Sequence, residues 1–296
     1  MRPPGRPPPA GIVGETGGVL SRRTFVIGGV GAVAAGGVAF VEVGPRRVLH
    51  QVGLVNSPDH HVPESGWPVE EFTLDSAALR QSVAWAVARP PDAAVSGVVL
   101  CLHGRNDDHR FAFDTIHVHD VVASLGLCLA VVAVDGGADN YWHPRRSGAD
   151  PLTMIKSELL PAIDAVLERS MPRTVLGWSM GGYGALLVGE QMPTEFRAVA
   201  AASPATWDSF EHSAAGAFDD AADFARYDVR DALAQLSGIT VRIDCGTDDG
   251  FIGQARRVAA SLPVPNQGRF SQGFHDAAYW RSIAPAQIAT LAAVIQ

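Results

Sequence analysis

The sequence predicts an α/β fold with a mostly parallel central sheet and helices on both faces. Short apolar runs without polar alternation are separated by segments of helical periodicity, which is typical of parallel strands buried on both sides. The chain has 296 residues, of which 47% are hydrophobic, so it can bury one substantial core. This composition excludes a disordered chain, a collagen-like repeat and a disulfide-rich scaffold.

The expected elements follow in chain order. Residues 69–75 and 81–88 are expected to form an opening antiparallel pair of strands. The later strands are expected at 95–102, 127–134, 174–177, 198–202, 240–245 and 268–272. Helices are expected over 152–169 and 181–191, and a final helix closes the chain. The stretch 205–238, rich in Ala, Asp and aromatic residues, is interpreted as a small helical cap over one end of the sheet.

The first 45 residues (1–45) resemble a signal or anchor segment of the twin-arginine type. Arg22 and Arg23 stand before an apolar run of about 17 residues, the short limit for crossing a bilayer, and its glycines make it only weakly hydrophobic. Residues 46–67 are expected to be a linker, and 68–296 the domain that carries the chemistry. We therefore expect an exported protein, either secreted or held at the membrane or cell envelope by an uncleaved apolar segment.

Charge and cysteine content exclude several functions. The net charge is −8, and six arginines lie within residues 1–47, so the rest of the chain is more acidic still and would repel nucleic acid. Cys101, Cys128 and Cys245 fall in apolar runs and are expected to be unpaired buried thiols. His117 and His119 have a spacing that could bind metal, but no third ligand is evident, so no metal site is expected.

A strand, turn and helix pattern points to Ser179 as a nucleophile. The strand over 174–176 leads into a Gly-x-Ser-x-Gly motif in which Gly177 and Gly181 flank the serine. The glycines leave room for a sharp reversal, which lifts the hydroxyl clear of the sheet. The reversal also places the hydroxyl at a helix amino end, where backbone amides and the helix dipole favour an oxyanion.

A serine nucleophile needs a base, and the base needs an acid to orient it. In folds with this turn the acid follows the serine and the histidine comes last. His275 fits the base because it follows the last expected strand, whereas His212 comes too early, within the cap. Asp248 and Asp249 follow the strand over 240–245, and neighbouring side chains point different ways, so only one can face the histidine. Asp249 is preferred, and Asp248 is the alternative.

Backbone amides and aromatic side chains complete the expected site. The strand ending at residue 102 is followed by His103-Gly104, and a turn there would let the amide of Arg105 join that of Met180 in an oxyanion hole. His103 itself is expected to be structural. Four residues are candidate contacts to the substrate, although each also fits simple packing: Trp142, His143, Trp178 and Trp207.

Together these residues resemble the esterase D/antigen 85 family of α/β-hydrolases, over about residues 70–296. The motifs that carry the resemblance are His103-Gly104, Gly177-Trp-Ser-Met-Gly-Gly182, Gly246-x-x-Asp249-x-Phe251 and Gly273-Phe-His275-Asp-x-x-Tyr-Trp280. The resemblance implies an α/β-hydrolase fold and carboxylester hydrolysis or acyl transfer, without a metal or cofactor. It implies that Ser179, Asp249 and His275 form the triad, with Arg105 and Met180 as oxyanion donors.

Two departures narrow this expectation. The antigen 85 mycolyltransferases use Glu as the acid and lack the paired glycines after Ser-Met, so mycolyl transfer to trehalose is not expected. The cytosolic S-formylglutathione hydrolases of the family carry no export signal. The sequence thus predicts an exported serine carboxylesterase that acts on a small-molecule or lipid ester through an acyl-enzyme. The alternatives are a cell-envelope acyltransferase with the same triad and a non-catalytic binding protein on a hydrolase scaffold.

Overall fold

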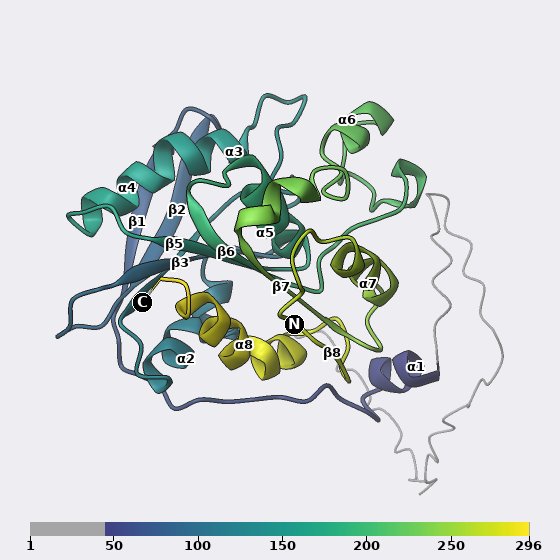
Figure 1. Ribbon diagram of the computed structural model, residues 1–296, viewed down its shortest axis with the longest axis horizontal. Helices are drawn as coiled ribbons and strands as arrows, with labels where there is room; N and C mark the ends of the chain where they lie inside the picture. The colour runs from purple at the N-terminus through teal and green to yellow at the C-terminus, as the bar shows by residue number, and fades with distance from the viewer. Residues whose placement is uncertain (1–44, 296) are drawn as a thin grey trace, which may run out of the picture. The chain divides into compact units, whose positions relative to one another are not determined.

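The computed structural model describes residues 45–295, and these contain one eight-stranded sheet. The strands are β1 (Val69–Ser76), β2 (Gln81–Ala88), β3 (Gly97–Leu102), β4 (Leu129–Val134), β5 (Arg173–Trp178), β6 (Phe196–Ala202), β7 (Thr240–Gly246) and β8 (Phe270–Ser271). Their order across the sheet is β1-β2-β4-β3-β5-β6-β7-β8 (Figure 1). β2 pairs antiparallel with β1 and β4, and every later pairing is parallel. The predicted α/β-hydrolase fold is confirmed.

Helices cover both faces of this sheet (Figure 1). α2 (Val118–Ser124) and α8 (Ala277–Ala292) pack on one face and on each other. The other face is covered by α3 (Pro151–Thr153), α4 (Leu160–Val166), α5 (Met180–Gln191) and α7 (Ile252–Ala260). A π-helical stretch, Met154–Leu159, joins α3 to α4, so the single helix predicted over 152–169 is one irregular helical segment.

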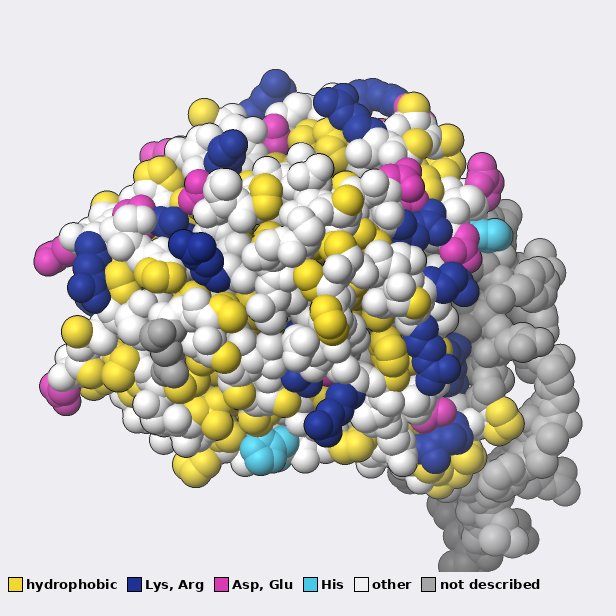
Figure 2. All heavy atoms as spheres, in the orientation of Figure 1, with side chains coloured by type: hydrophobic (Ala, Val, Ile, Leu, Met, Phe, Trp, Pro, Cys, Tyr) yellow, Lys and Arg dark blue, Asp and Glu magenta, His cyan; other side chains and the backbone are white. Residues whose placement is uncertain are grey.

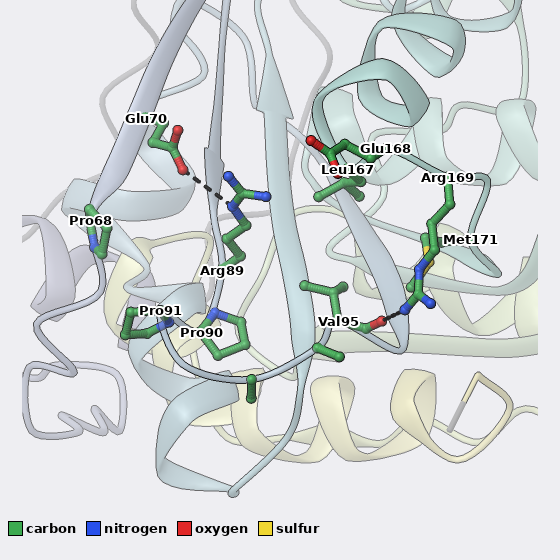
Figure 3. Close-up of a pocket in the computed structure, with 12 residues that line it drawn as sticks. Pro68, Glu70, Arg89, Pro90, Pro91, Val95, Leu167, Glu168, Arg169 and Met171 are labelled. Atoms are coloured by element: carbon green, nitrogen blue, oxygen red, sulfur yellow. Dashed lines mark hydrogen bonds and ion pairs between the residues drawn. The ribbon is translucent and has the colours of Figure 1, made fainter.

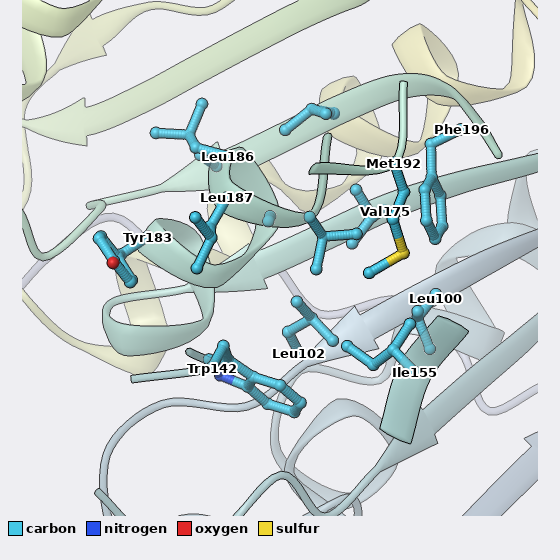
Figure 4. Packing of buried hydrophobic residues seen from close by; sticks show 14 of the residues in the cluster. Leu100, Leu102, Trp142, Ile155, Val175, Tyr183, Leu186, Leu187, Met192 and Phe196 are labelled. Carbon is cyan, nitrogen blue, oxygen red and sulfur yellow. The ribbon is translucent and has the colours of Figure 1, made fainter. Parts of the chain in front are cut away.

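The core is densest where α5 crosses the sheet. Every residue of α5 except Gln191 is buried, because the helix packs on β5 and β6 while other elements cover its outer side. Figure 4 shows Leu186 and Leu187 of α5 close to Val175 of β5 and Leu102 of β3. A helix that is apolar all round fits only inside a protein. α5 is therefore held firmly relative to the strand that precedes it.

The expected cap is made of short helices that share the main core. Between β6 and β7 lie a 3₁₀ turn at Phe210–His212, α6 (Ala221–Arg226) and a 3₁₀ turn at Leu233–Gly238. Phe218 and Leu236 of this stretch are buried in the same apolar cluster as α5. The cap is thus packed onto the body and does not form a separate layer.

The segment 46–67, expected to be a linker, is instead part of the folded body. It begins within α1 (Pro45–Gln51) and continues along the surface toward β1 (Figure 1). Arg47 hydrogen-bonds the loop after β7, and Ser57 is buried against the residues that follow β8. Its composition suggested a linker. The contacts that hold it on the body could not be foreseen, because their partners lie about two hundred residues away in sequence.

The predicted signal or anchor segment lies outside the described residues, apart from Pro45. Within residues 45–295, no helix has the length and hydropathy needed to cross a bilayer. On the described surface, Figure 2 shows arginines interspersed with acidic side chains over one face.

The cysteines are free thiols, as predicted. Cys101 in β3 and Cys245 in β7 are buried, and Cys128, just before β4, is partly buried. Burial raises the pKa of the Cys101 and Cys245 thiols well above the ordinary range. Both are therefore protonated packing residues and not nucleophiles.

A buried carboxyl group near the end of α5 makes the stability pH-dependent. Glu190 is 4% exposed, and its Oε1 has no hydrogen-bond partner among the described residues. Burial, together with the nearby carboxylates of Asp228 and Asp231, raises the pKa of Glu190 to about 9. The folded protein therefore keeps this carboxyl protonated at neutral pH.

Replacing Glu190 with Gln is expected to stabilise the protein above about pH 5. The unfolded chain releases the Glu190 proton near the ordinary pKa of 4.5, and the folded chain releases it only near 9. Folded stability is thus lost as pH rises through that window, and the Gln variant avoids the loss. We expect a gain of about 1–3 kcal/mol near pH 8 and a smaller gain near pH 5, measured by chemical unfolding. Glu64→Gln, at an exposed position, is the matched control, and an equal gain there would contradict this account.

Candidate active site

Ser179 lies in the sharp turn that joins β5 to α5. Its backbone angles, φ 55° and ψ −115°, are strained for a residue with a side chain. A Cβ on Gly177 would lie 2.0 Å from the carbonyl oxygen of Gly181, and a Cβ on Gly181 would lie 1.9 Å from that of Leu102. Both glycines are required by close backbone approach, which is the reason predicted from the motif.

Three side chains from three separate loops meet at this turn. The Ser179 hydroxyl lies 2.8 Å from Nε2 of His275, and Nδ1 of the same ring lies 2.8 Å from Oδ2 of Asp249. The network fits a neutral imidazole whose Nδ1–H donates to the carboxylate while Nε2 accepts from the hydroxyl. The serine follows β5, the acid follows β7 and the histidine follows β8, so all three lie at the carboxyl edge of the sheet. The structure brings together the three residues that the sequence predicted.

Asp249, and not Asp248, is the carboxylate that faces the histidine. Asp249 is fully buried, and its Oδ1 accepts a hydrogen bond from the amide of Phe251 at 2.8 Å. Burial alone would raise the pKa of Asp249, but hydrogen bonds from His275, Phe251 and Ser203 outweigh it and hold the pKa below the ordinary value. The carboxylate of Asp248 instead accepts from Nε of Arg46 at 3.0 Å. The alternative acid is thus excluded by geometry.

Three further residues surround this network. Ser203 follows β6 with a positive φ of 48° and is fully buried, and its hydroxyl also lowers the pKa of Asp249. The indole of Trp280 donates to Ser203 Oγ at 3.1 Å and packs against the ring of His275, 5.1 Å between centroids. Phe251 packs on the same ring at 5.3 Å. Sequence reasoning missed Ser203, although its place just after a central strand was the available signal.

The two backbone amides predicted as oxyanion donors belong to Met180 and Arg105. Met180 is the first residue of α5, so its amide has no partner within the helix. A Cβ on Gly104 would lie 3.8 Å from Cβ of Ser179, so the turn that contains Arg105 adjoins the nucleophile. Neither the Met180 nor the Arg105 amide donates to another group in residues 45–295.

His103 holds this second turn in shape. Its Nε2 accepts from the amide of Gly136 at 3.0 Å, and its Nδ1–H donates to the carbonyl of Gly104 at 2.7 Å. Burial lowers the pKa of His103, which keeps the ring neutral and able to accept. The expected structural role of His103 therefore agrees with its contacts.

Comparison with known proteins places the chain in a family. A family model described as "Putative esterase" matches residues 76–287. The chain belongs to the Esterase family. A search of curated proteins finds no match.

Solved structures with similar folds include several hydrolases. A ferulic acid esterase superposes with a TM-score of 0.66 and 22% identity, over 77% of this chain and 98% of that one. An S-formylglutathione hydrolase from Agrobacterium tumefaciens gives 0.68 and 18%, over 81% and 100%. The fluorophosphonate-binding serine hydrolase F of Staphylococcus aureus gives 0.62 and 18%, over 76% and 98%. At these identities the likeness establishes the fold, and the family assignment supports hydrolase activity of the esterase type.

Three of the four residues predicted to contact substrate are closed off from it in this esterase-family chain. Trp142, His143 and Trp178 have no exposed surface. Trp142 turns inward because its own backbone and that of Tyr141 adopt positive φ angles of 59° and 54°. These three predictions are corrected: the side chains form core beneath the site.

Trp207 remains a candidate substrate contact. It is partly exposed, and its ring packs on Phe251 at 5.7 Å between centroids. Phe251 in turn packs on His275. Trp207 is thus linked to His275 through the ring of Phe251.

One cluster in the described residues has metal-ligand spacing, and its contacts are those of an ion pair. It comprises Asp108, His109 and Asp135. His109 Nδ1 lies 2.9 Å from Asp135, and Nε2 lies 2.6 Å from Glu71. Burial would lower the pKa of His109, but the two carboxylates outweigh it and raise the pKa. Each ring nitrogen of His109 thus faces a carboxylate oxygen within hydrogen-bonding distance. His117 and His119 both lie beside Asp120.

Hollows lie at both edges of the sheet. Figure 3 shows a hollow of about 640 Å³ that includes Glu70, Arg89 and Val95, next to the amino ends of β3 and β5. That edge is opposite to the one carrying Ser179, so this hollow does not serve the triad. A smaller hollow of about 320 Å³ includes His275 in its wall. It is the one that adjoins the candidate chemistry.

The packing at the serine turn predicts that substitution by alanine is far more destabilising at Gly181 than at Gly253. Gly181→Ala would drive a methyl group into the backbone of Leu102 and is expected to destabilise the protein by at least about 3 kcal/mol. Gly253→Ala, in α7, meets only a flexible arginine end at 3.8 Å and is expected to be neutral or to stabilise by up to about 1 kcal/mol. Denaturant unfolding of both variants measures the difference, and similar stabilities would contradict the packing argument.

Proposed function

We propose that this protein is a serine carboxylesterase in which Ser179 is the nucleophile, His275 the general base and Asp249 the acid that orients it. The observation that carries the proposal is the pair of 2.8 Å hydrogen bonds linking hydroxyl, imidazole and buried carboxylate. The Esterase family assignment supports hydrolysis of the ester class. The Arg105 and Met180 amides are the proposed oxyanion donors.

Acylation proceeds by attack of Ser179 Oγ on the ester carbonyl carbon. The hydroxyl proton passes to Nε2 of His275 as the new C–O bond forms, and the carbonyl oxygen becomes an oxyanion. When the tetrahedral intermediate collapses, the bond to the alcohol oxygen breaks and His275 returns the proton to that oxygen. The products of this half-reaction are the free alcohol and an ester on Ser179.

Deacylation repeats these steps with water. His275 removes a proton from water as the water oxygen attacks the acyl carbon, and the proton then passes to Ser179 Oγ as the carboxylic acid leaves. Asp249 stabilises the imidazolium formed in both halves, and its lowered pKa keeps it ionised for that role. None of these steps requires a metal or a cofactor.

The two amides beside Ser179 supply the electrostatic part of catalysis. A fixed amide aimed at a developing oxyanion is worth about 3 kcal/mol in comparable sites. The Met180 amide is held by the start of α5, and the Arg105 amide by the turn that His103 supports. Donors held by the fold in this way would limit the reorganisation that the reaction needs.

The proposed substrate is a small-molecule or lipid ester, met outside the cytoplasm. The similar structures named above include enzymes of ferulic acid esters and of S-formylglutathione, so this fold accommodates different acyl and leaving groups. The twin-arginine pattern before an apolar run supports export to the envelope or medium, with tethering as a variant of the same proposal.

Replacing Ser179 with Ala tests the nucleophile. The variant should fold normally yet lose hydrolysis of p-nitrophenyl acyl esters by about 10⁴-fold or more, because no acyl-enzyme forms. A fluorophosphonate probe should label the wild-type protein at Ser179 and leave the variant unlabelled. A wild-type chain that resists labelling would favour a binding protein on this scaffold.

The two adjacent aspartates provide a matched test of the acid. Asp249→Asn should lower kcat by about 10⁴-fold, because the amide cannot hold the imidazole in the required tautomer. Asp248→Asn removes a neighbouring carboxylate of equal charge and should leave kcat within about twofold. Steady-state kinetics on one ester compare the two, and the reverse ranking would show that the wrong aspartate has been assigned.

A further inference from the structure

Residues 45–57, named here the amino-terminal brace, lie against both loops that supply the acid and the base. The acid, Asp249, is on the loop after β7, and the base, His275, is on the loop after β8. Only two residue pairs join β8 to β7, and backbone hydrogen bonds from Thr247 to Ser271 and from Asp248 to Gly273 extend this link into the two loops. Contacts from the brace reach each loop separately.

Arg47 holds the acid loop. Its Nε donates to the carbonyl of Asp248 at 2.6 Å, and a terminal nitrogen donates to the carbonyl of Asp249. Two donors of one planar guanidinium on consecutive carbonyls fix the peptide from which the triad carboxylate extends. Neither hydrogen bond involves the carboxylate of Asp249 itself. Arg47 therefore acts on the position of Asp249.

Ser57 and His50 hold the base loop. Ser57 Oγ accepts from the amide of Phe274 at 2.9 Å and donates to the carboxylate of Asp276 at 2.8 Å. These two partners are the residues on either side of His275. The ring of His50 stacks on Phe274, with centroids 3.9 Å apart, and its Nε2 lies 3.1 Å from Asp276.

The brace also borders the hollow beside the base. α1 forms one wall of the hollow of about 320 Å³ beside the base, which is lined by Arg47, His50, Gln51, Asp248, Gly250, Phe274 and His275. In an ester hydrolase the base returns its proton to the departing alcohol oxygen. The brace thus lies next to the group whose position decides both proton transfers.

We propose that the amino-terminal brace is part of the active site, with Arg47 and Ser57 as positioning residues that keep Asp249 and His275 at hydrogen-bonding distance. This inference rests on the proposed esterase function. Neither residue touches the reacting atoms, so its effect is on geometry. A misplacement of about 1 Å can cost about 10²-fold in rate, which is why such contacts matter.

Point variants of the full-length chain test the brace. Ser57→Ala and Arg47→Gln should each lower kcat by about tenfold per active site, with KM for Ser57→Ala within about twofold of wild type. Arg47→Lys should recover part of the loss, because an ammonium group can hold one of the two carbonyls. Titration with a fluorophosphonate gives the concentration of active sites in each preparation. Each kcat is calculated from that concentration, so a smaller amount of folded protein does not lower it.

Arg89→Gln is the matched control. Arg89 is 38% exposed at its side chain and pairs with Glu70, near the amino ends of the strands and away from the triad, so kcat should stay at the wild-type value. If kcat per titrated active site is unchanged in both Ser57→Ala and Arg47→Gln, the results overturn the proposed positioning role of the brace. A loss confined to the number of titrated sites would also overturn it, since the segment would then serve only folding. A wild-type chain that neither labels nor hydrolyses any ester would instead overturn the proposed function, and the brace with it.

Discussion

A buried, ionised carboxylate is the constraint on which the site depends. Asp249 has no exposed surface, and a charge in that position is costly unless it is paired and hydrogen-bonded. The His275 ring, the Phe251 amide and the Ser203 hydroxyl together hold its pKa low despite burial. Each of these partners comes from a loop after a different element or from the acid loop itself. The charged carboxylate of Asp249 is therefore stabilised only when these loops are held together. The brace adds to the contacts that hold them.

The parallel sheet explains why these groups can meet. Carboxyl ends of neighbouring parallel strands lie at one edge, so the residues that directly follow β5, β6, β7 and β8 come to the same place. The strained turn at Ser179 is held by two glycines that allow α5 to approach β3 and β5 closely. Buried packing around α5 then opposes any relaxation of that strain.

Some polar side chains outside the triad have structural roles, although their arrangement resembles that of functional groups. His109 bridges two carboxylates, and His103 shapes the turn beside the nucleophile. Both lie near the site, yet their partners account for every ring nitrogen. The chemistry of a histidine here follows from what its two nitrogens contact, which residue type alone does not reveal.

The sequence by itself determined the fold class, the strand positions to within a few residues, and the nucleophile, acid and base candidates. It could do so because apolar periodicity and glycine spacing are local, and because a backbone reversal around a serine leaves a local motif. The choice between Asp248 and Asp249, the burial of Trp142 and Trp178, and the place of residues 45–57 were decided only by the tertiary structure. Each of these depends on backbone direction or on contacts between residues far apart in the chain, and neither is encoded in a short stretch of sequence.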